Sequence, residues 1–480
     1  MRYLILLTAL LVTAATADEG MWQPHQLPDL SDRLQQLGLE IDAQNLTALD
    51  KFPMNAVVSL GGCSASFVSP QGLVVTNHHC VYGSVQYNSS PENNLLVEGF
   101  LARRLEEEIP AAPGSSVYVT EAVTEVTAAT LAGITDSTPG IDRYRIIETN
   151  RKALIADCEA TGVHRCSVSS FHQGLEYFLL KQLEIKDIRL VYAPATSIGK
   201  YGGDIDNWQW PRHTGDFGFY RAYVDVDGRP AEFSEDNIPY QPASFLEVSA
   251  KGVEEGDFVM GVGYPGSTNR YRTSSEIENE FTWFYPQARQ FREDLMRIID
   301  ENSVAGSQAR IAYESTLASL SNYAKNYQSM VESYQHSDFI NRRRQEESNL
   351  AAWIESDSSR AQQYSSAVIQ LQDLIESDHA TRERDLVSSY MSYATLPNTA
   401  ERLYRLAIEK QKPDAEREPG YQQRDLSRFR QSMQRISRRY DKQVDKAMLS
   451  YLLGRYAELP EQYRSNAVDS FYGISDRFDQ

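Results

Sequence analysis

The apolar residues of the first 275 positions fall into short runs that turn-forming residues separate. The runs are rich in Val, Ile, Phe and Tyr, and Gly, Pro, Asn and Asp lie between them. Short runs at such spacing are typical of antiparallel sheets that form barrels or sandwiches. We therefore predict strands at 56–60, 65–68, 73–76, 117–120, 177–180, 189–192, 217–224 and 258–262, and helices at 95–108 and 142–158.

The pattern changes near residue 275. Residues 281–480 contain only four Gly and five Pro, and their long runs are rich in Glu, Gln, Arg, Ala, Leu and Tyr. Leu317, Leu320, Ala324, Tyr327 and Val331 recur at the spacing of one helix face. The sequence therefore predicts a mixed β and α fold, with a β-rich region at 18–275 and an α-helical domain at 276–480.

The first 17 residues have the pattern of a secretory signal peptide. Arg2 precedes an apolar run at 3–12, and Ala15-Thr16-Ala17 offers a small-x-small cleavage site before Asp18. No run in the chain approaches the roughly 20 apolar residues of a transmembrane helix, so we expect an exported protein without membrane insertion. The net charge of −19 argues against a nucleic-acid partner, because polyanions bind clustered Lys and Arg.

Four cysteines are an even number in a chain bound for an oxidising compartment, where cysteines pair as disulfides. Of the three pairings we favour Cys63 with Cys80 and Cys158 with Cys166, because each pair encloses a short segment that can fold back on itself. The spacing fits no common zinc pattern, so no metal site is expected from the cysteines.

The segment GLVVTNHHC at 72–80 places two adjacent histidines at the end of a predicted strand. A Cys63–Cys80 bridge would clamp the hairpin and hold the preceding residue rigidly, as a catalytic base requires. A strand followed by Thr-x-x-His-Cys resembles the histidine segment of chymotrypsin-fold serine proteases, in which His79 would be the base and His78 structural. Two alternatives stay open: histidines that only cap hydrogen bonds, and a metal-dependent hydrolase built on both imidazoles, for which the sequence offers no further clustered ligands.

The segment GKYGGDIDNWQWPRHTGDFGFYRAYVDVDG at 199–228 has the composition of an ordered loop that runs into a strand. Asp216 stands at the junction, where its carboxylate could accept the Nδ1–H of His79, fix its tautomer and stabilise the imidazolium. Asp204 and Asp206 are the alternatives, and we interpret them as turn-forming residues.

Asn207 and Trp208 in the same loop offer an amide and a flat apolar wall. Such a pair suits a pocket for the first residues of a peptide. The other interpretation of the tryptophan is a core position, which is the more frequent use of a buried Trp.

Seven segments closely resemble the bacterial dipeptidyl-peptidase 7 and dipeptidyl-peptidase 11 family, exported serine exopeptidases that release dipeptides from peptide N-termini. The resemblance implies a chymotrypsin-like double β-barrel with a large inserted α-helical domain that caps the cleft. It implies peptide substrates with a free N-terminus, no cofactor, and a periplasmic or cell-surface location in a Gram-negative bacterium, and it allows a homodimer. The segments are GMWQPHQLP, GGCSASFVSPQGLVVTNHHC, GGDIDNWQWPRHTGDF, YRAYV, GYPGSTNRY, SNYAKNY and PDAEREPGYQQRDL.

The resemblance also implies roles for five residues. His79 in NHHC resembles the family's base, and Asp216 in TGDF resembles its orienting acid. Asn207 and Trp208 in DNW resemble substrate contacts, and Asn322 in SNYAKN resembles an asparagine that helps hold the substrate's free α-amine. Asn322 lies opposite the apolar stripe of its helix, so we expect its side chain to face solvent or a cleft.

The family's nucleophilic serine has no match in the sequence. In the family it lies in a Gly-Gly-Asn-Ser-Gly-type segment of the second barrel, and no Gly-x-Ser-Gly follows Asp216 here. Ser267 in YPGSTN lacks the small-residue context of an oxyanion turn. We therefore expect a C-terminally truncated sequence with an incomplete second barrel, inactive because a triad without its serine loses most of its catalysis. The alternative is a non-catalytic protein that binds peptide N-termini.

Overall fold

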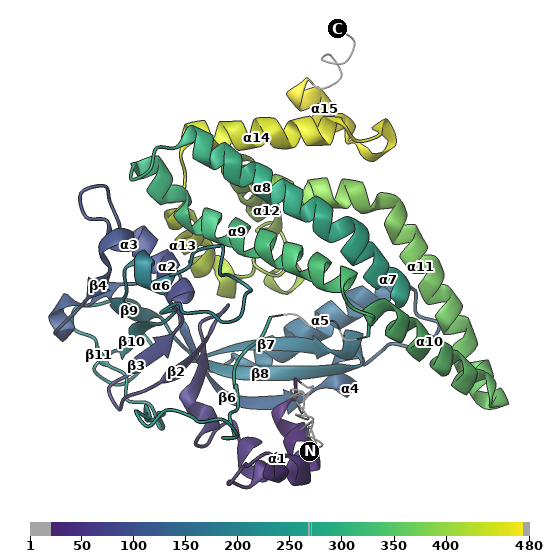
Figure 1. Ribbon diagram of the computed structural model, residues 1–480, viewed down its shortest axis with the longest axis horizontal. Coiled ribbons are helices and arrows are strands. Elements are labelled where there is room, and N and C mark those ends of the chain that lie inside the picture. The colour runs from purple at the N-terminus through teal and green to yellow at the C-terminus, as the bar shows by residue number, and fades with distance from the viewer. Residues whose placement is uncertain (1–20, 267–268, 270, 474–480) are drawn as a thin grey trace, which may run out of the picture.

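The structure is a computed structural model that describes residues 21–266, 269 and 271–473. The signal peptide expected at 1–17 and Ser267 lie outside the described residues. Figure 1 shows the strands and short helices of the first half on one side, and the long helices of the second half stacked against them. The mixed β and α fold with a large helical part is thereby confirmed.

The described strands form one antiparallel sheet. Their order is β4-β9-β10-β3-β2-β1-β6-β8-β7, with β11 paired to β10 and β5 paired to β9. β3 and β10 are neighbours, with Gly218 opposite Thr76. The strands are β1 (Val57–Ser59), β2 (Ser64–Phe67), β3 (Leu73–Thr76), β4 (Phe100–Leu101), β5 (Ile109–Pro110), β6 (Val117–Glu125), β7 (His164–Phe171), β8 (Glu176–Ile185), β9 (Asp187–Ala193), β10 (Gly218–Val224) and β11 (Ile238–Pro239).

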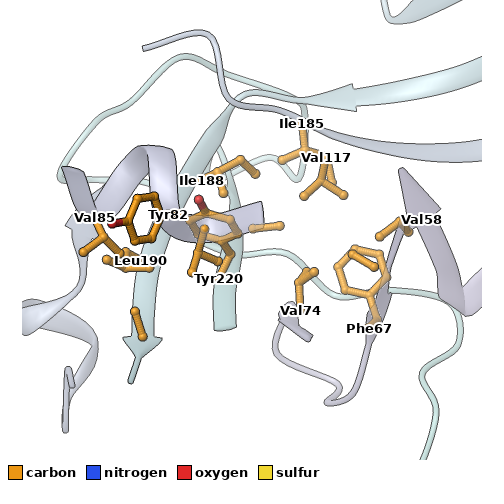
Figure 2. Close-up of a cluster of buried hydrophobic side chains, with 14 of the residues drawn as sticks. Val58, Phe67, Val74, Tyr82, Val85, Val117, Ile185, Ile188, Leu190 and Tyr220 are labelled. Atoms are coloured by element: carbon orange, nitrogen blue, oxygen red, sulfur yellow. The ribbon is translucent and has the colours of Figure 1, made fainter. Parts of the chain in front are cut away.

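Buried and partly buried residues alternate along β2 and β3, which shows which face of these strands points into the core. In β2 and β3 every second side chain is buried, and Phe67 lies opposite Val74 in the ladder. One face of this hairpin therefore enters the sheet core. Figure 2 shows that core, with Tyr82 and Val85 of the neighbouring helix packed beside Leu190.

The helical part has its own apolar core, to which Phe291, Leu295, Leu320 and Met448 contribute. The helices of the described residues are α1 (Ser31–Gln36), α2 (His78–Tyr87), α3 (Leu95–Glu98), α4 (Thr127–Thr130), α5 (Gly140–Cys158), α6 (Thr196–Gly199), α7 (Ser274–Asn279), α8 (Tyr285–Asn302), α9 (Gln308–Gln335), α10 (Phe339–Glu355), α11 (Ser358–Met391), α12 (Thr395–Glu409), α13 (Leu426–Ile436), α14 (Lys442–Ala457) and α15 (Asn466–Tyr472).

The helix α9 connects the two cores. The predicted apolar stripe is confirmed, since Leu320 and Ala324 are buried and Leu317 and Tyr327 pack against the helical core. Ile311, near the start of the same helix, belongs instead to the core of the sheet. α9 therefore packs against both the core of the sheet and the core of the helical part, which fixes its position between them.

Two predicted elements were wrong. The helix expected at 95–108 ends after one turn, because Gly99 adopts a φ of +78° and a Cβ there would lie 2.8 Å from the main-chain nitrogen of Ala195. The strand expected at 258–262 does not form: Phe258 packs in a small cluster with Leu39, while Val259 is exposed. No strand of the described residues pairs with this run.

Candidate active site

The two adjacent histidines begin a helix, whereas we expected them at the end of a strand. β3 ends at Thr76, Asn77 is extended, and α2 begins at His78. Cys80 in the first turn of α2 is paired with Cys63, which precedes β2. The first turn of α2 is therefore tied to the hairpin, with His79 directly beside the bridge.

Asp216 holds both the main chain and the side chain of His79. Its Oδ1 accepts the main-chain N–H of His79 at 3.0 Å, and its Oδ2 accepts Nδ1–H of the ring at 2.8 Å. Asn77 adds a third donor, whose Nδ2 lies 3.3 Å from the same Oδ2. The carboxylate is 20% exposed and the imidazole 67%, so the ring is fixed on one side and open on the other.

The hydrogen bonds keep the carboxylate ionised. Burial acts to raise the pKa of Asp216, but hydrogen bonds from the ring and main chain of His79 outweigh it and hold that pKa below its ordinary value. An ionised carboxylate accepts Nδ1–H and leaves Nε2 as the basic nitrogen. The arrangement can therefore take a proton at Nε2 and stabilise the resulting imidazolium.

His78 has a different environment from its neighbour. Its ring is 2% exposed and lies against Gly199, where a Cβ would come within 2.4 Å of the ring. Burial lowers the pKa of His78 and outweighs the opposing effect of Asp216. A neutral, buried imidazole at this position fits the structural role expected for it.

The donors near His79 do not fit the metal centre considered above. In the described part of the chain, the His, Cys, Asp and Glu group close enough to share an ion is Cys63, His79 and Cys80, with ligand atoms within 4.8 Å of one another. Metals bind cysteine as thiolate, and these two sulfurs are bonded to each other. His78 faces Gly199 and is not part of the group.

The loop between α6 and β10 meets α9 through three residues that the sequence singled out. Asn207 Nδ2 donates to Asn322 Oδ1 at 3.0 Å, and Trp208 Nε1 donates to the main-chain oxygen of Asn322 at 3.1 Å. Asn207 is 9% exposed, whereas Trp208 is 52% exposed. The structure thus brings the three together where the sheet part and the helical part meet.

Asp204 and Asp206, the alternatives to Asp216, lie in the turn that starts this loop. Asp204 pairs with Lys200 at 2.9 Å, and the main-chain N–H of Asp206 donates to Gly202 at 3.2 Å. Neither has a hydrogen bond to His79 among the described residues, which supports their interpretation as turn residues.

Sequence reasoning missed two residues of this region. Asn77 precedes the histidines directly, so its place in the NHHC segment was a usable signal. Arg212 donates from Nη1 to Asn207 Oδ1 at 3.1 Å, and no local pattern distinguishes it from other loop arginines. It fixes the orientation of the Asn207 amide.

The other cysteine pair lies far along the chain from this region. Cys158, at the end of α5, is joined to Cys166 in β7. Both pairings are those favoured from the sequence. None of the helices in the described ranges has the length and apolarity needed to cross a bilayer.

Comparison with known proteins extends these observations. The sequence profile of the family described as peptidase S46 matches residues 17–479. The Asp/Glu-specific dipeptidyl-peptidase of Shewanella putrefaciens is 44% identical over 481 residues, which cover 99% of this chain and 64% of that protein. Dipeptidyl-peptidase 7 of Porphyromonas gingivalis is 39% identical over 370 residues, which cover 75% of this chain and 51% of that protein.

A solved structure agrees with the sequence comparison. DPP11 of Porphyromonas endodontalis in complex with the dipeptide Arg-Glu superposes with a TM-score of 0.75 at 29% identity. The match covers 92% of this chain and 64% of the solved chain. This chain therefore spans between about half and two thirds of the length of the proteins it matches here.

Proposed function

Because this chain belongs to the peptidase S46 family, we propose that it carries the base and the orienting acid of an exported serine dipeptidyl-peptidase. The observation that carries the proposal is the pair of hydrogen bonds that the Asp216 carboxylate accepts from the main chain and the ring of His79. Together they set the tautomer and the orientation of the imidazole ring, both of which a general base needs. The names of the relatives supply the reaction class: release of dipeptides from peptide N-termini.

In the proposed mechanism His79 Nε2 takes the proton of a serine hydroxyl as the serine oxygen attacks the scissile carbonyl carbon. The imidazolium is stabilised by Asp216 and returns the proton to the leaving amine, which leaves an acyl-enzyme. In the second half His79 Nε2 takes a proton from water as the water oxygen attacks the acyl carbon. The bond to the serine oxygen then breaks, and His79 gives the proton back to the serine. The serine is the member of the triad for which the sequence offers no Gly-x-Ser-Gly segment after Asp216.

The second part of the proposal concerns the substrate's free N-terminus. The amide oxygens of Asn207 and Asn322 each accept one hydrogen bond and have a second lone pair that can accept from an α-ammonium group. Half-exposed Trp208 offers an apolar wall beside them. The superposable DPP11 structures contain the dipeptides Arg-Glu and Arg-Asp, which supports peptides as ligands. Partners are thus proposed to be peptides with unblocked N-termini, met in the periplasm or at the cell surface.

Hydrolysis is tested with the protein produced from the natural gene and fluorogenic dipeptides. Substrates with an acidic second residue and with an aliphatic or aromatic one are compared, because relatives of both names match the chain. Release of the fluorophore with the free-amine substrate, and none with its N-acetyl form, is expected. His79→Ala should abolish the release. Equal activity of His79→Ala and the unaltered protein would refute the assignment.

A second candidate is a non-catalytic protein that binds peptide N-termini, which the missing Gly-x-Ser-Gly segment favours. The two candidates differ in one result. Calorimetry with Arg-Glu would show saturable heat in both, whereas product release in the fluorogenic assay occurs only for the peptidase. Absence of heat at millimolar peptide would count against both.

A further inference from the structure

The helix that begins with the two histidines is also held at its other end by the helical part. Gln86, in the last turn of α2, is 1% exposed, and both ends of its amide have partners. Nε2 donates to the main-chain oxygen of Arg438 at 2.9 Å, and Oε1 accepts Nε–H of Arg439 at 3.1 Å. These arginines lie in the short link between α13 and α14. A buried amide with both ends satisfied fixes the two elements against each other.

Gly83 makes room for this contact. A Cβ at this position would lie 2.7 Å from Nη2 of Arg439, and the same Nη2 lies 3.5 Å from the main-chain oxygen of Gly83. Glycine is among the poorest residues for a helix interior. Its presence one turn before Gln86 is explained by the guanidinium that lies over it. We call Gly83, Gln86 and Arg439 the α2 junction.

Arg439 directs its partly buried charge at α2. Its hydrogen-bond acceptors in the described residues are the oxygens of Gln86 and Gly83, both on α2, and no described carboxylate lies within ion-pair distance of it. Burial lowers the pKa of Arg439, and repulsion from Arg435 adds to this effect. A guanidinium keeps its proton at neutral pH, so this partly buried cation depends on one helix for its described hydrogen-bond partners.

The geometry of a rigid helix connects this junction to His79. Seven residues separate His79 from Gln86, or about 10 Å along the axis. A tilt of about 6° over that length moves one end by about 1 Å. An N–H···O distance of 2.8 Å lengthened by that amount is no longer a hydrogen bond. The Cys63–Cys80 bridge ties the first turn of α2 to the hairpin at one point, so the direction of the helix axis depends on how the far end of α2 is held.

We propose that Arg439 is a positioning residue for His79, through which the helical part sets the orientation of the base against Asp216. α9 supports α2 from another side, since Tyr82 Oη donates to Glu314 Oε2 at 3.4 Å. That this positioning of His79 matters for catalysis rests on the proposed function. The positioning itself is measured without hydrolysis, so a failure of the peptidase assay would leave it standing.

The test is the exchange of the His79 Nδ1–H proton with water, measured by NMR on the whole chain labelled with ¹⁵N-histidine. His79→Gln assigns the signal. Arg439→Gln is expected to speed the exchange at least ten-fold, because the tilted helix opens the bond to Asp216. Arg439→Lys, which keeps a cation and a donor, should restore part of the protection.

Arg428→Gln is the matched control. Arg428 also joins the helical part to the sheet, through Glu184 at 2.6 Å and Tyr118 Oη at 2.5 Å, and none of its described hydrogen bonds or ion pairs reaches α2. Less than a two-fold change is expected there. Equal effects of Arg439→Gln and Arg428→Gln, or no effect of either, would overturn the proposal.

Gly83→Ala serves as a second, milder variant if Arg439→Gln does not fold. The new methyl group pushes the guanidinium away and should also speed the exchange. An exchange rate unchanged in Gly83→Ala would count against the proposal.

Discussion

Replacing Asp216 with asparagine should reverse the tautomer of His79. The introduced amide would keep one oxygen for the main-chain N–H of His79, now accepted by Oδ1 of Asp216 at 3.0 Å. It would place an NH₂ group where Oδ2 now accepts Nδ1–H at 2.8 Å. Since NH₂ cannot accept a proton, the ring is expected to move its hydrogen to Nε2, the nitrogen that must be free to act as a base.

The size of this effect follows from the one bond that is lost. A hydrogen bond to a charged group contributes about 1.5–3 kcal/mol. At about 1.4 kcal/mol per factor of ten, the ratio of the two tautomers should change by roughly 10- to 100-fold. Asp216→Asn should therefore convert a mainly Nδ1–H ring into a mainly Nε2–H ring at neutral pH.

The assay is ¹⁵N NMR of the histidine side chains, in which protonated and bare ring nitrogens have well-separated shifts. Asp204→Asn is the control, because Asp204 pairs with Lys200 in the same loop and has no described bond to His79. Unchanged shifts for His79 in Asp216→Asn, with the protein folded, would refute the assignment of the orienting acid.

Three further predictions concern stability and binding. The depressed pKa of Asp216 contributes stability that is complete above the ordinary aspartate pKa near 3.8 and is lost as pH falls through the lower pKa of the folded state. The free energy of unfolding in urea should therefore fall less steeply with decreasing pH below about pH 4 in Asp216→Asn than in the unaltered protein, and equal slopes would contradict this. Gly199→Ala should cost about 1–3 kcal/mol in urea unfolding because the new Cβ meets the His78 ring, whereas Gly140→Ala, with nothing within 4 Å, should be nearly neutral. Trp208→Phe removes the indole donor to α9, and calorimetry should show peptide binding weakened about 2- to 10-fold; unchanged affinity would separate Trp208 from the peptide site.

The parts of the site that the sequence could predict are those encoded in short segments. The NHHC segment and Cys63 point to His79. His79 directly precedes Cys80, so a Cys63–Cys80 bridge also holds the histidine close to the hairpin. TGDF identifies Asp216, because a loop that runs into a strand places its last residue at the sheet edge. Asn322 came from the family resemblance, since periodicity alone leaves its helix face open to solvent or a cleft.

Long-range contacts explain what the sequence could not supply. α2 was missed because its 10 residues follow a strand almost directly, and the helix is stabilised by packing of Tyr82 and Val85 on the sheet. The helix expected at 95–108 was interrupted by the close approach of Gly99 to another segment. Arg212 and Arg439 act through partners distant in sequence or in irregular loops, and no local pattern marks such pairs.

The most direct test of the central claim is an NMR titration with Arg-Glu that follows the Trp208 indole N–H and the His79 ring together. The claim is that the asparagine pair and the base belong to one site for peptide N-termini. We predict that both signals shift with a single dissociation constant, and that N-acetyl-Arg-Glu shifts neither. Equal binding of the acetylated peptide, or a shift at Trp208 without one at His79, would contradict the account.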